Sequence, residues 1–521
     1  MPDQSFAGEI GTAYGFTEPV LEYGAASLNG GAEPAARVRV PLRMINRHGL
    51  VAGATGTGKT KTLQMLTEQL SDSGVPVFLV DIKGDISGVG APGQSGDRIT
   101  ARLAQIGQTD WAPQAYPVEF LTLNRGGSGV RLRATVSSFG PILLAKVLDL
   151  NETQQSVLAL VFKYADDQKL PLVDLSDLRS TLNYLNGDAG QAAMAEYGGL
   201  STATVGVMIR KIVELEQQEA DAFFGQPEFD IGDLIRTAPN GRGVVSVLEV
   251  ADMQDRPKLF STFMMWLLAA VYHHLPEVGD LDKPKLVFFF DEAHLLFEGA
   301  NPSFLDQIEM VARLIRSKGV GVYFVTQSPS DVPPSVLAQL GNRVQHALRA
   351  FTPDDQKRID QTARTFPSTT HYDVAKELTS LGIGEALITV MSPAGVPTPT
   401  VHTIMRPPRS LMAQLDPAAF AAAVAASPIA GRYASDIDPE SAKEMLAARM
   451  EQAAAEAPQP QGTSADATPE PSQGMDWAQA ARIGTRVLTS STTNTLLRGV
   501  FGILGGGAAR RTTRRTTRRR R

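Results

Sequence analysis

Short apolar runs and helix-like segments alternate along most of the chain. From Gly49 to about residue 410, runs typical of strands are separated by segments with the apolar spacing of amphipathic helices. The strand-like runs are 50–52, 77–80, 118–121, 244–250, 286–290, 320–325, 345–348 and 386–390. Several are continuously apolar rather than alternating, which indicates strands buried on both faces of a mainly parallel sheet. We therefore predict an α/β sandwich.

The same pattern divides the chain into segments. Strand signals stop between about residues 140 and 235, where apolar residues follow helical spacing. Residues 457–475 are rich in Pro, Ser, Thr and Gln, the composition of a flexible, disordered linker. The predicted segments are a short N-terminal segment (1–48), a sheet core (49–139 and 236–410), a helical insertion (140–235), an Ala-rich helical segment (411–456), the linker (457–475), and an apolar, Arg-rich and disordered tail (476–521).

Composition and charge exclude several kinds of protein. The 521 residues include no cysteine, which removes disulfides, Cys-ligated zinc and thiol nucleophiles. The net charge is −6, but residues 510–521 hold eight Arg and no acid, so the rest carries 41 basic and 55 acidic side chains. Any contact with a polyanion must therefore be local. No secretory signal is apparent and no apolar stretch approaches the ~20 residues that cross a bilayer, so we expect a cytoplasmic protein.

Residues 53–60, GATGTGKT, match the phosphate-binding pattern G-x-x-x-x-G-K-[ST]. An apolar run precedes them and a helical pattern follows, the context in which backbone N–H groups and a helix N-terminus face phosphate oxygens. Lys59 is expected to reach the β- and γ-phosphates, and the Thr60 hydroxyl to ligate Mg²⁺. The expected nucleotide contacts are Gly53, Ala54, Thr55, Gly56, Thr57, Gly58, Lys59, Thr60 and Lys61.

Three other strand-like runs end in polar residues. The run 286–290 is followed by Asp291, expected to hold Mg²⁺, and by Glu292, placed to polarise an attacking water. This pair indicates hydrolysis of the nucleotide rather than binding alone. Asp81 closes the run VFLVD, and Gln327 closes VYFVTQ as a sensor of the γ-phosphate or a water-orienting amide. Ligands of open α/β sheets lie at the carboxyl ends of strands, so we add Asp81 and Gln327 to the site.

Four segments in this order resemble the HerA/FtsK-type P-loop ATPases: GATGTGKT, VFLVDIKGD, FFFDEAHLL and VYFVTQSPSDVP. Over roughly residues 5–410 the chain is most similar to the bacterial HerA-like YjgR family. The resemblance implies a RecA-like core with the extra strands of the ASCE class, ATP and Mg²⁺ as cofactors, and assembly into a hexameric ring. HerA itself begins with a β-barrel, for which the 52 residues before Gly53 leave no room. This departure weakens the transfer of a partner nuclease and of DNA-end processing, but not of the ATPase.

The resemblance also implies that an Arg from a neighbouring subunit completes each site. On the matching segment ARLIRSKG the candidates are Arg313 and Arg316, and the sequence does not choose between them. Asn342 and Arg343, in the GNR that follows the sensor run, are an alternative.

Two functions stay open on the sequence. One is a ring-forming ATP hydrolase that translocates on DNA or acts as a helicase-like motor. The other is an ATP-driven protein-remodelling or membrane-associated scaffold ATPase. The Arg tail would bind nucleic-acid phosphates or, with the apolar residues before it, an anionic membrane surface. A basic pore loop would favour DNA, and the acidic body shows no obvious one.

Overall fold

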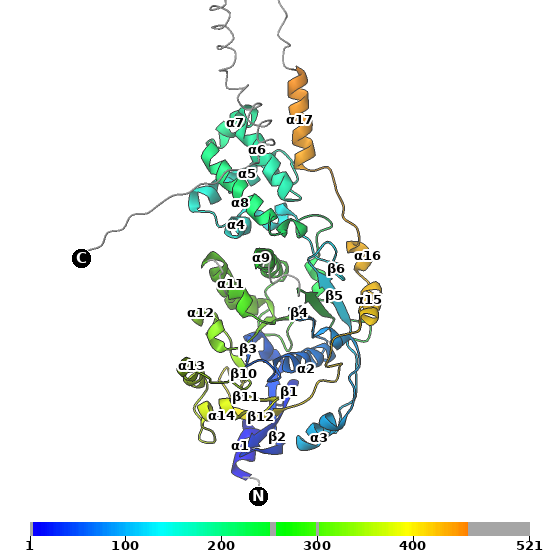
Figure 1. Cartoon of the computed structure of the whole chain (residues 1–521), viewed down its shortest axis with the longest axis vertical. Helices are drawn as coiled ribbons and strands as arrows, with labels where there is room; N and C mark the ends of the chain where they lie inside the picture. Colours follow the sequence, from blue (N-terminus) through cyan, green and yellow to red (C-terminus); the bar gives the residue numbers. More distant parts are fainter. Residues whose placement is uncertain (1–3, 251–256, 298–301, 457–521) are drawn as a thin grey trace, which may run out of the picture. The chain divides into compact units, whose positions relative to one another are not determined.

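The computed structural model describes residues 4–250, 257–297 and 302–456 (Figure 1). The predicted linker and Arg-rich tail lie outside these residues, so the expectations for both remain predictions. Among the helices of the described ranges, none has the length and hydrophobicity that a bilayer span requires.

The described residues form a 12-stranded sheet in the order β2-β1-β12-β11-β10-β3-β9-β8-β4-β7-β5-β6. All pairs from β10 to β6 are parallel, and the pairs from β2 to β10 are antiparallel. The predicted α/β fold with a mainly parallel sheet is thus confirmed. The strands are β1 Val20–Leu28, β2 Gly31–Pro41, β3 Gly49–Ala52, β4 Val77–Asp81, β5 Val118–Thr122, β6 Val130–Arg131, β7 Val245–Glu249, β8 Leu286–Phe290, β9 Val320–Thr326, β10 Asn342–Gln345, β11 Glu385–Thr389 and β12 Val401–Met405.

The central strands are buried on both faces, as their continuous apolar runs predict. In β8, Phe288 and Phe290 pack into the core on one face, while Val287 and Phe289 pack into the core on the other. Every residue of β3, β4, β8 and β9 is buried. The run 345–348 is displaced from its strand, because β10 ends at Gln345.

The N-terminal segment contributes two strands, β1 and β2, that the sequence pattern does not clearly predict. β1 and β2 form a hairpin whose turn residues, Asn29 and Gly30, have φ angles of 52° and 80°. Such a turn needs left-handed backbone at both positions, which Asn-Gly supplies. β1 then pairs with β12, with Gly24 opposite Met405, so this segment extends the sheet instead of preceding it.

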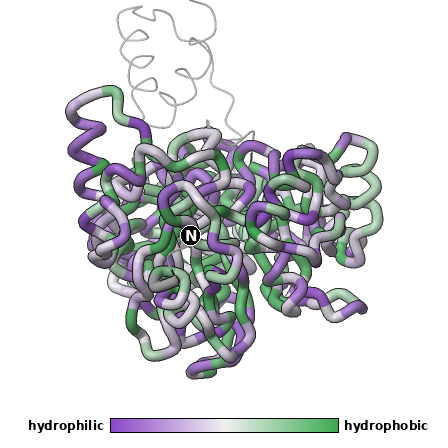
Figure 2. The backbone as a smooth tube through the Cα atoms, turned by 90° about the horizontal axis from the view of Figure 1, so that it is seen from below, coloured by the Kyte–Doolittle hydropathy of each residue, from purple (hydrophilic) through white to green (hydrophobic). Residues whose placement is uncertain are grey.

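Helices cover the sheet (Figure 1). Along the outer helices, hydrophobic and hydrophilic residues alternate (Figure 2), as expected of helices that are buried on one side. Those around the core are α1 Gln4–Ala13, α2 Lys59–Asp72, α3 Asp97–Gln105, α9 Pro257–His274, α10 His294–Phe297, α11 Pro302–Leu314, α12 Pro334–Leu337, α13 Pro353–Ala363 and α14 Val374–Ser380.

Helices α4 to α8 form one group within the stretch expected to be helical (Figure 1). They are α4 Val136–Val147, α5 Glu152–Asp167, α6 Leu175–Asn186, α7 Asp188–Met194 and α8 Thr202–Glu216. Capping boxes at Asn151 and Asp174 begin α5 and α6. After α8, Phe223 packs edge-on against Phe263 and Trp266 of α9. The helical group therefore shares its hydrophobic core with one face of the sheet.

Residues 406–456, here called the C-terminal strap, run from the end of β12 past the sheet core to the helical group. They include α15 Pro417–Ala425, α16 Ala430–Tyr433 and α17 Ala442–Glu456. Near its start, Ser410 binds the buried carboxylate of Glu68 on α2. Further on, Phe420 stacks on Phe120 of β5 with ring centroids 4.2 Å apart. The strap thus ties elements beside the phosphate loop to the rest of the fold.

Candidate nucleotide-binding site

The strand order brings the predicted site residues to one edge of the sheet. Strands β3, β9, β8 and β4 are consecutive and parallel, so their carboxyl ends lie together. Ala52 is in register with Thr326, and Val80 with Phe290. The residues that follow these strands therefore meet at this edge: the phosphate loop, Gln327, Asp291 with Glu292, and the Asp81 turn.

The phosphate loop is held by backbone hydrogen bonds to three different strand ends. Gly53 N–H donates to the Thr326 carbonyl at 3.2 Å, and Ala54 N–H donates to the Ala347 carbonyl at 2.8 Å. Gly384 N–H donates to the Thr57 carbonyl at 3.0 Å. These contacts fix the loop through segments that lie far away in the sequence.

Two loop positions require glycine. Gly53 has a φ of 153°, and a Cβ there would lie 2.5 Å from the Cβ of His346. Gly58, with a φ of 117°, immediately precedes α2. Side chains at either position would strain the backbone, and at Gly53 a side chain would also collide with the Cβ of the buried His346. Glycine is what lets the loop pass this close to its support.

Lys59 and Thr60 occupy the first turn of α2. The Lys59 ammonium folds back over the loop and donates to the carbonyls of Gly53 at 2.7 Å and Ala54 at 3.2 Å. Burial lowers the pKa of Lys59, while the nearby carboxylate of Glu292 opposes the shift. Thr60 is half-buried. Lys61, on the same turn, donates to Gln64 Oε1 at 3.3 Å.

Asp291 and Glu292 follow β8 in an unusual backbone conformation. Asp291 is 3% exposed; its Oδ1 accepts from Glu292 N–H at 3.0 Å, while Oδ2 has no hydrogen-bond partner among the described residues. Burial and then the neighbouring Glu292 raise the pKa of Asp291 to about 7. Glu292 has a φ of 46°, which costs a non-glycine residue about 1–3 kcal/mol and is typical of functional sites.

Lys83, from the turn after β4, forms an ion pair with Glu292 Oε1. His294 Nδ1 lies 3.3 Å from Glu292 Oε2, close enough for an ion pair but without hydrogen-bond geometry. Burial alone would raise the pKa of Glu292, but Lys83 first, and then Lys59, outweigh it and lower the pKa. Glu292 is therefore ionised at neutral pH and able to accept a proton.

Asp81 shapes the turn that carries Lys83. Its carboxylate accepts from the backbone N–H groups of Lys83, Gly84 and Ile86 at 3.1, 2.8 and 2.9 Å. Burial raises the pKa of Asp81 to about 6. The proposed contact of Asp81 with the nucleotide remains a prediction, whereas its role in the turn is direct. One carboxylate oxygen each of Asp81, Asp85 and Asp291 lie within 4.8 Å of one another.

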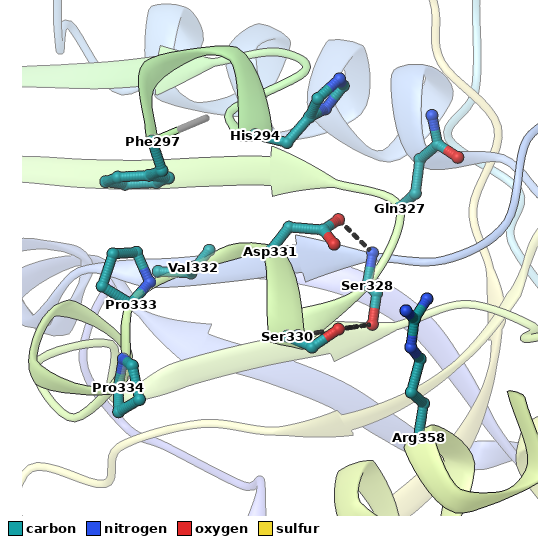
Figure 3. A pocket seen from close by; sticks show the side chains of 10 residues that line it. All are labelled: His294, Phe297, Gln327, Ser328, Ser330, Asp331, Val332, Pro333, Pro334 and Arg358. Atoms are coloured by element: carbon teal, nitrogen blue, oxygen red, sulfur yellow. Dashed lines mark hydrogen bonds between the residues drawn. The ribbon is translucent and has the colours of Figure 1, made fainter. Parts of the chain in front are cut away.

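Gln327 is exposed at the end of β9 and lines a cavity of about 640 Å³ together with His294, Asp331 and Arg358 (Figure 3). Gln327 and Arg358 lie on opposite sides of Ser328 in this view. Asp331 accepts from Thr326 Oγ1 at 2.7 Å and from Ser328 N–H at 2.9 Å, which fixes the backbone beside Gln327.

The two predicted arginine candidates lie away from this edge. Arg313 and Arg316 are exposed and precede β9, whereas Gln327 follows it. The seven residues of β9 separate the two ends by about 20 Å at ~3.3 Å per residue. Neither arginine is therefore placed to act in the site of its own chain.

The alternative pair, Asn342 and Arg343, has structural partners. Asn342 is buried and donates to the carbonyls of Met44 at 3.0 Å and His48 at 3.1 Å. Arg343 donates to the Thr365 carbonyl at 2.8 Å. Both residues begin β10, at the edge opposite the phosphate loop, so they too lie away from the site of their own chain.

Sequence reasoning missed two residues of the site, Lys83 and His346. Lys83 was visible in VFLVDIKGD, but nothing local links it to Glu292. His346 is fully buried, with Nε2 2.9 Å from Thr62 Oγ1 and Nδ1 2.8 Å from the Glu385 carbonyl. Burial lowers its pKa to about 4, so a neutral ring supports the phosphate loop. In the sequence, the role of His346 is indicated only by the presence of a single histidine in the strand-like run 345–348.

The residues at this edge fit a magnesium–nucleoside triphosphate. Gly53 and Gly58 keep the loop free of side chains, Lys59 and the N-terminus of α2 supply positive charge, and Thr60 and Asp291 supply oxygen ligands. The Oδ2 of Asp291 has no hydrogen-bond partner within the described ranges, and this is the clearest observation in favour of a cation here.

A strand–loop–helix unit at β3 and α2, with β9 inserted between β3 and β8, defines a P-loop NTPase of the RecA-like, ASCE type. The family model described as "Helicase HerA-like C-terminal" matches residues 27–511. The chain therefore belongs to this family, as the motifs predicted.

Among characterised proteins, the chain is 23% identical over 355 residues to the DNA double-strand break repair helicase HerA of Saccharolobus solfataricus, covering 67% of this chain and 63% of that protein. The HerA of Sulfurisphaera tokodaii is 23% identical over 373 residues, covering 67% and 64%. The chain thus spans slightly less than two thirds of the length of these relatives. Among solved structures, the bacterial conjugative coupling protein TrwBdeltaN70 matches with a TM-score of 0.50 at 16% identity, covering 79% of this chain and 94% of that one. This likeness shows the fold.

Proposed function

We propose that this chain is an Mg²⁺-dependent ATP hydrolase that acts as a motor on DNA. The observation that carries the proposal is the meeting of Lys59, Asp291 and an ionised Glu292 at one edge of the sheet. Membership of the HerA-like family supports DNA as the polymer, because the similar archaeal proteins are named as DNA double-strand break repair helicases.

The residues at the site divide the work of hydrolysis. Lys59 and the N-terminus of α2 neutralise the triphosphate. Thr60 and Asp291 would hold the cation, which would supply charge compensation for the transferred phosphoryl group. Glu292 accepts a proton from the attacking water, a role worth typically ~10²–10⁴-fold in rate. Lys83 keeps Glu292 ionised and in place. Gln327 senses the γ-phosphate from the end of β9.

The motor works as a homo-oligomeric ring, for which we propose six subunits from the family resemblance. Arg313 and Arg316 support an assembly because both are exposed about 20 Å from the site of their own chain, at ~3.3 Å per residue along β9. In a ring, one subunit would present such an arginine to the γ-phosphate held by its neighbour. We place this ring in the cytoplasm, with the Arg tail as a contact for DNA or an anionic membrane surface.

The identity of the partner, DNA or a membrane surface, is tested by measuring ATP turnover. The assay is run with duplex DNA, with anionic phospholipid vesicles and with neither, at several protein concentrations. We expect duplex DNA to stimulate turnover, and the specific activity to rise with protein concentration as rings assemble. The Glu292→Gln variant reports the background. Stimulation by vesicles but not by DNA would favour the membrane-associated scaffold instead, and no turnover under any condition would contradict the proposal.

The shared site is tested by mixing two inactive proteins, Glu292→Gln and the double variant Arg313→Ala/Arg316→Ala. In mixed rings some interfaces pair an intact Glu292 with intact arginines, so part of the activity should return. The matched control mixes Glu292→Gln with Lys59→Ala, because each of these subunits lacks part of its own site and no interface is complete. No recovery in rings shown by native mass spectrometry to contain both proteins would exclude these arginines.

A further inference from the structure

Three carboxylates converge beside the phosphate loop for reasons that can be traced to the fold. β4 and β8 are parallel neighbours with Val80 opposite Phe290, so Asp81 and Asp291 leave the sheet side by side. Asp81 then accepts three backbone N–H groups and closes a tight turn, which returns Asp85 toward the sheet edge. As a result, one oxygen from each of Asp81, Asp85 and Asp291 lie within 4.8 Å of one another.

This turn is fixed from outside as well as from within. On the C-terminal strap, Gln414 Nε2 donates to the Lys83 carbonyl at 3.1 Å, and Leu415 N–H donates to Ser87 Oγ at 3.1 Å. A Cβ at Gly84 would lie 3.3 Å from Gln414 Nε2. The carboxylates are therefore held close together by the fold.

Hydrogen bonding does not satisfy this cluster. Oδ2 of Asp291, a residue only 3% exposed, has no hydrogen-bond partner among residues 4–250, 257–297 and 302–456, and neither has Oδ1 of Asp85. Three lysines act on these groups, and each directs its hydrogen bonds elsewhere: Lys83 to Glu292, Lys61 to Gln64, and Lys59 to backbone carbonyls of the phosphate loop. Carboxylates at this spacing repel one another, and a buried charge without a partner is costly. A bound cation would remove both penalties.

We propose that Asp81, Asp85 and Asp291 form a binding site for a divalent cation of the Mg²⁺ or Mn²⁺ type that is occupied without nucleotide. A set of oxygen ligands without His or Cys suits these hard cations rather than zinc. The site shares Asp291 with the proposed ATPase, and in that respect it rests on the proposed function. It differs in using Asp81 and Asp85 and in not requiring Thr60.

The turn-forming role of Asp81 does not by itself explain the cluster. Three N–H bonds to Asp81 account for the conformation of residues 83–86. They leave unexplained the oxygens of Asp85 and Asp291 that have no partner in the part of the chain that the structure describes. A carboxylate can accept these bonds and still offer a lone pair to a cation. The two roles are therefore compatible.

The test measures Mn²⁺ binding to the full chain after chelator treatment and in the absence of nucleotide, by the loss of the free-Mn²⁺ electron paramagnetic resonance signal. We expect one Mn²⁺ per chain in the wild type and in Thr60→Ala, and affinity at least about tenfold weaker in Asp85→Asn. Asp97→Asn, an exposed carboxylate in the first turn of α3, is the matched control and should bind as the wild type does. The absence of cysteine removes thiolate sites from the background.

A second measurement uses the wild-type protein, so it does not depend on a variant that folds. Fe²⁺ replaces Mn²⁺, and ascorbate with peroxide then cleaves the backbone near the bound iron. Mass spectrometry should find cuts near residues 81–86 and 291 without nucleotide. The site would be overturned if the protein were cut only elsewhere, or if it bound no Mn²⁺ without nucleotide. It would also be overturned if Asp85→Asn bound Mn²⁺ as the wild type does, or if Thr60→Ala lost as much Mn²⁺ affinity as Asp85→Asn. Because no turnover is measured, a failure here leaves the ATPase untouched, and an inactive protein could still bind Mn²⁺.

Discussion

Replacing Lys83 with methionine removes the ammonium that pairs with Glu292 and keeps a side chain of similar length. A hydrogen bond between charged groups contributes about 1.5–3 kcal/mol. The Lys83 side chain is 44% exposed and that of Glu292 is 6% exposed, so solvent screening reduces this to about 1–2 kcal/mol. Since ~1.4 kcal/mol corresponds to a factor of ten in rate, kcat should fall about 5- to 30-fold.

The pH dependence separates this effect from a general loss of structure. Burial raises the pKa of Glu292, and the Lys83 ammonium is the main influence that lowers it. Without Lys83 the pKa must rise, so Glu292 is protonated at higher pH and the acid limb of the kcat profile moves to higher pH. The assay is steady-state ATP turnover across pH, with KM for ATP expected to change less than kcat.

Two control variants sharpen the result. Lys83→Arg keeps the positive charge and should keep the position of the acid limb. Lys376→Met removes an exposed lysine of α14, and should change neither kcat nor the profile. A Lys83→Met protein with wild-type kcat and an unshifted acid limb would refute the reasoning, and so would a faster one, which would mean that Lys83 restrains Glu292.

Three further predictions concern single residues. Lys59→Ala should abolish nucleotide binding, measured by calorimetry, with little change in thermal unfolding, because the Lys59 ammonium hydrogen-bonds to backbone carbonyls of its own loop. Binding at wild-type affinity would show that the site is misplaced. Glu292→Gln should bind ATP but turn it over ~10²–10⁴-fold more slowly, whereas Asp291→Asn should mainly raise the Mg²⁺ concentration required; equal defects in both variants would contradict this division. Burial lowers the pKa of His48 to about 4, compared with 6.5 in the unfolded chain. As the pH falls, the unfolded state therefore takes up a proton before the folded state does. The free energy of unfolding should fall by up to about 3 kcal/mol between pH 6.5 and pH 4. Urea unfolding of His48→Gln should depend less on pH over this range, and an unchanged slope would assign the acid sensitivity elsewhere.

The sequence by itself determined the fold class, the phosphate loop and the edge of the sheet where the site lies. Each of these features follows from a local pattern. Continuous apolar runs predict strands buried on both faces, glycines at 53 and 58 allow the backbone of the phosphate loop, and carboxylates directly after apolar strands mark the edge of the site. Parallel strands place their carboxyl ends at a common edge, so the approximate meeting of Asp81, Asp291 and Gln327 also followed from the pattern.

Only the tertiary structure decided which side chains touch. Lys83 and Glu292 are 209 positions apart, and His346 and Thr62 are 284 apart, so no local pattern relates them. The pairing of β1 with β12 likewise joins the two ends of the core, and the run 20–28 gave no sign of that partner. Strand order and register fix such contacts because they set which residues stand side by side, and both are properties of the assembled sheet rather than of any segment.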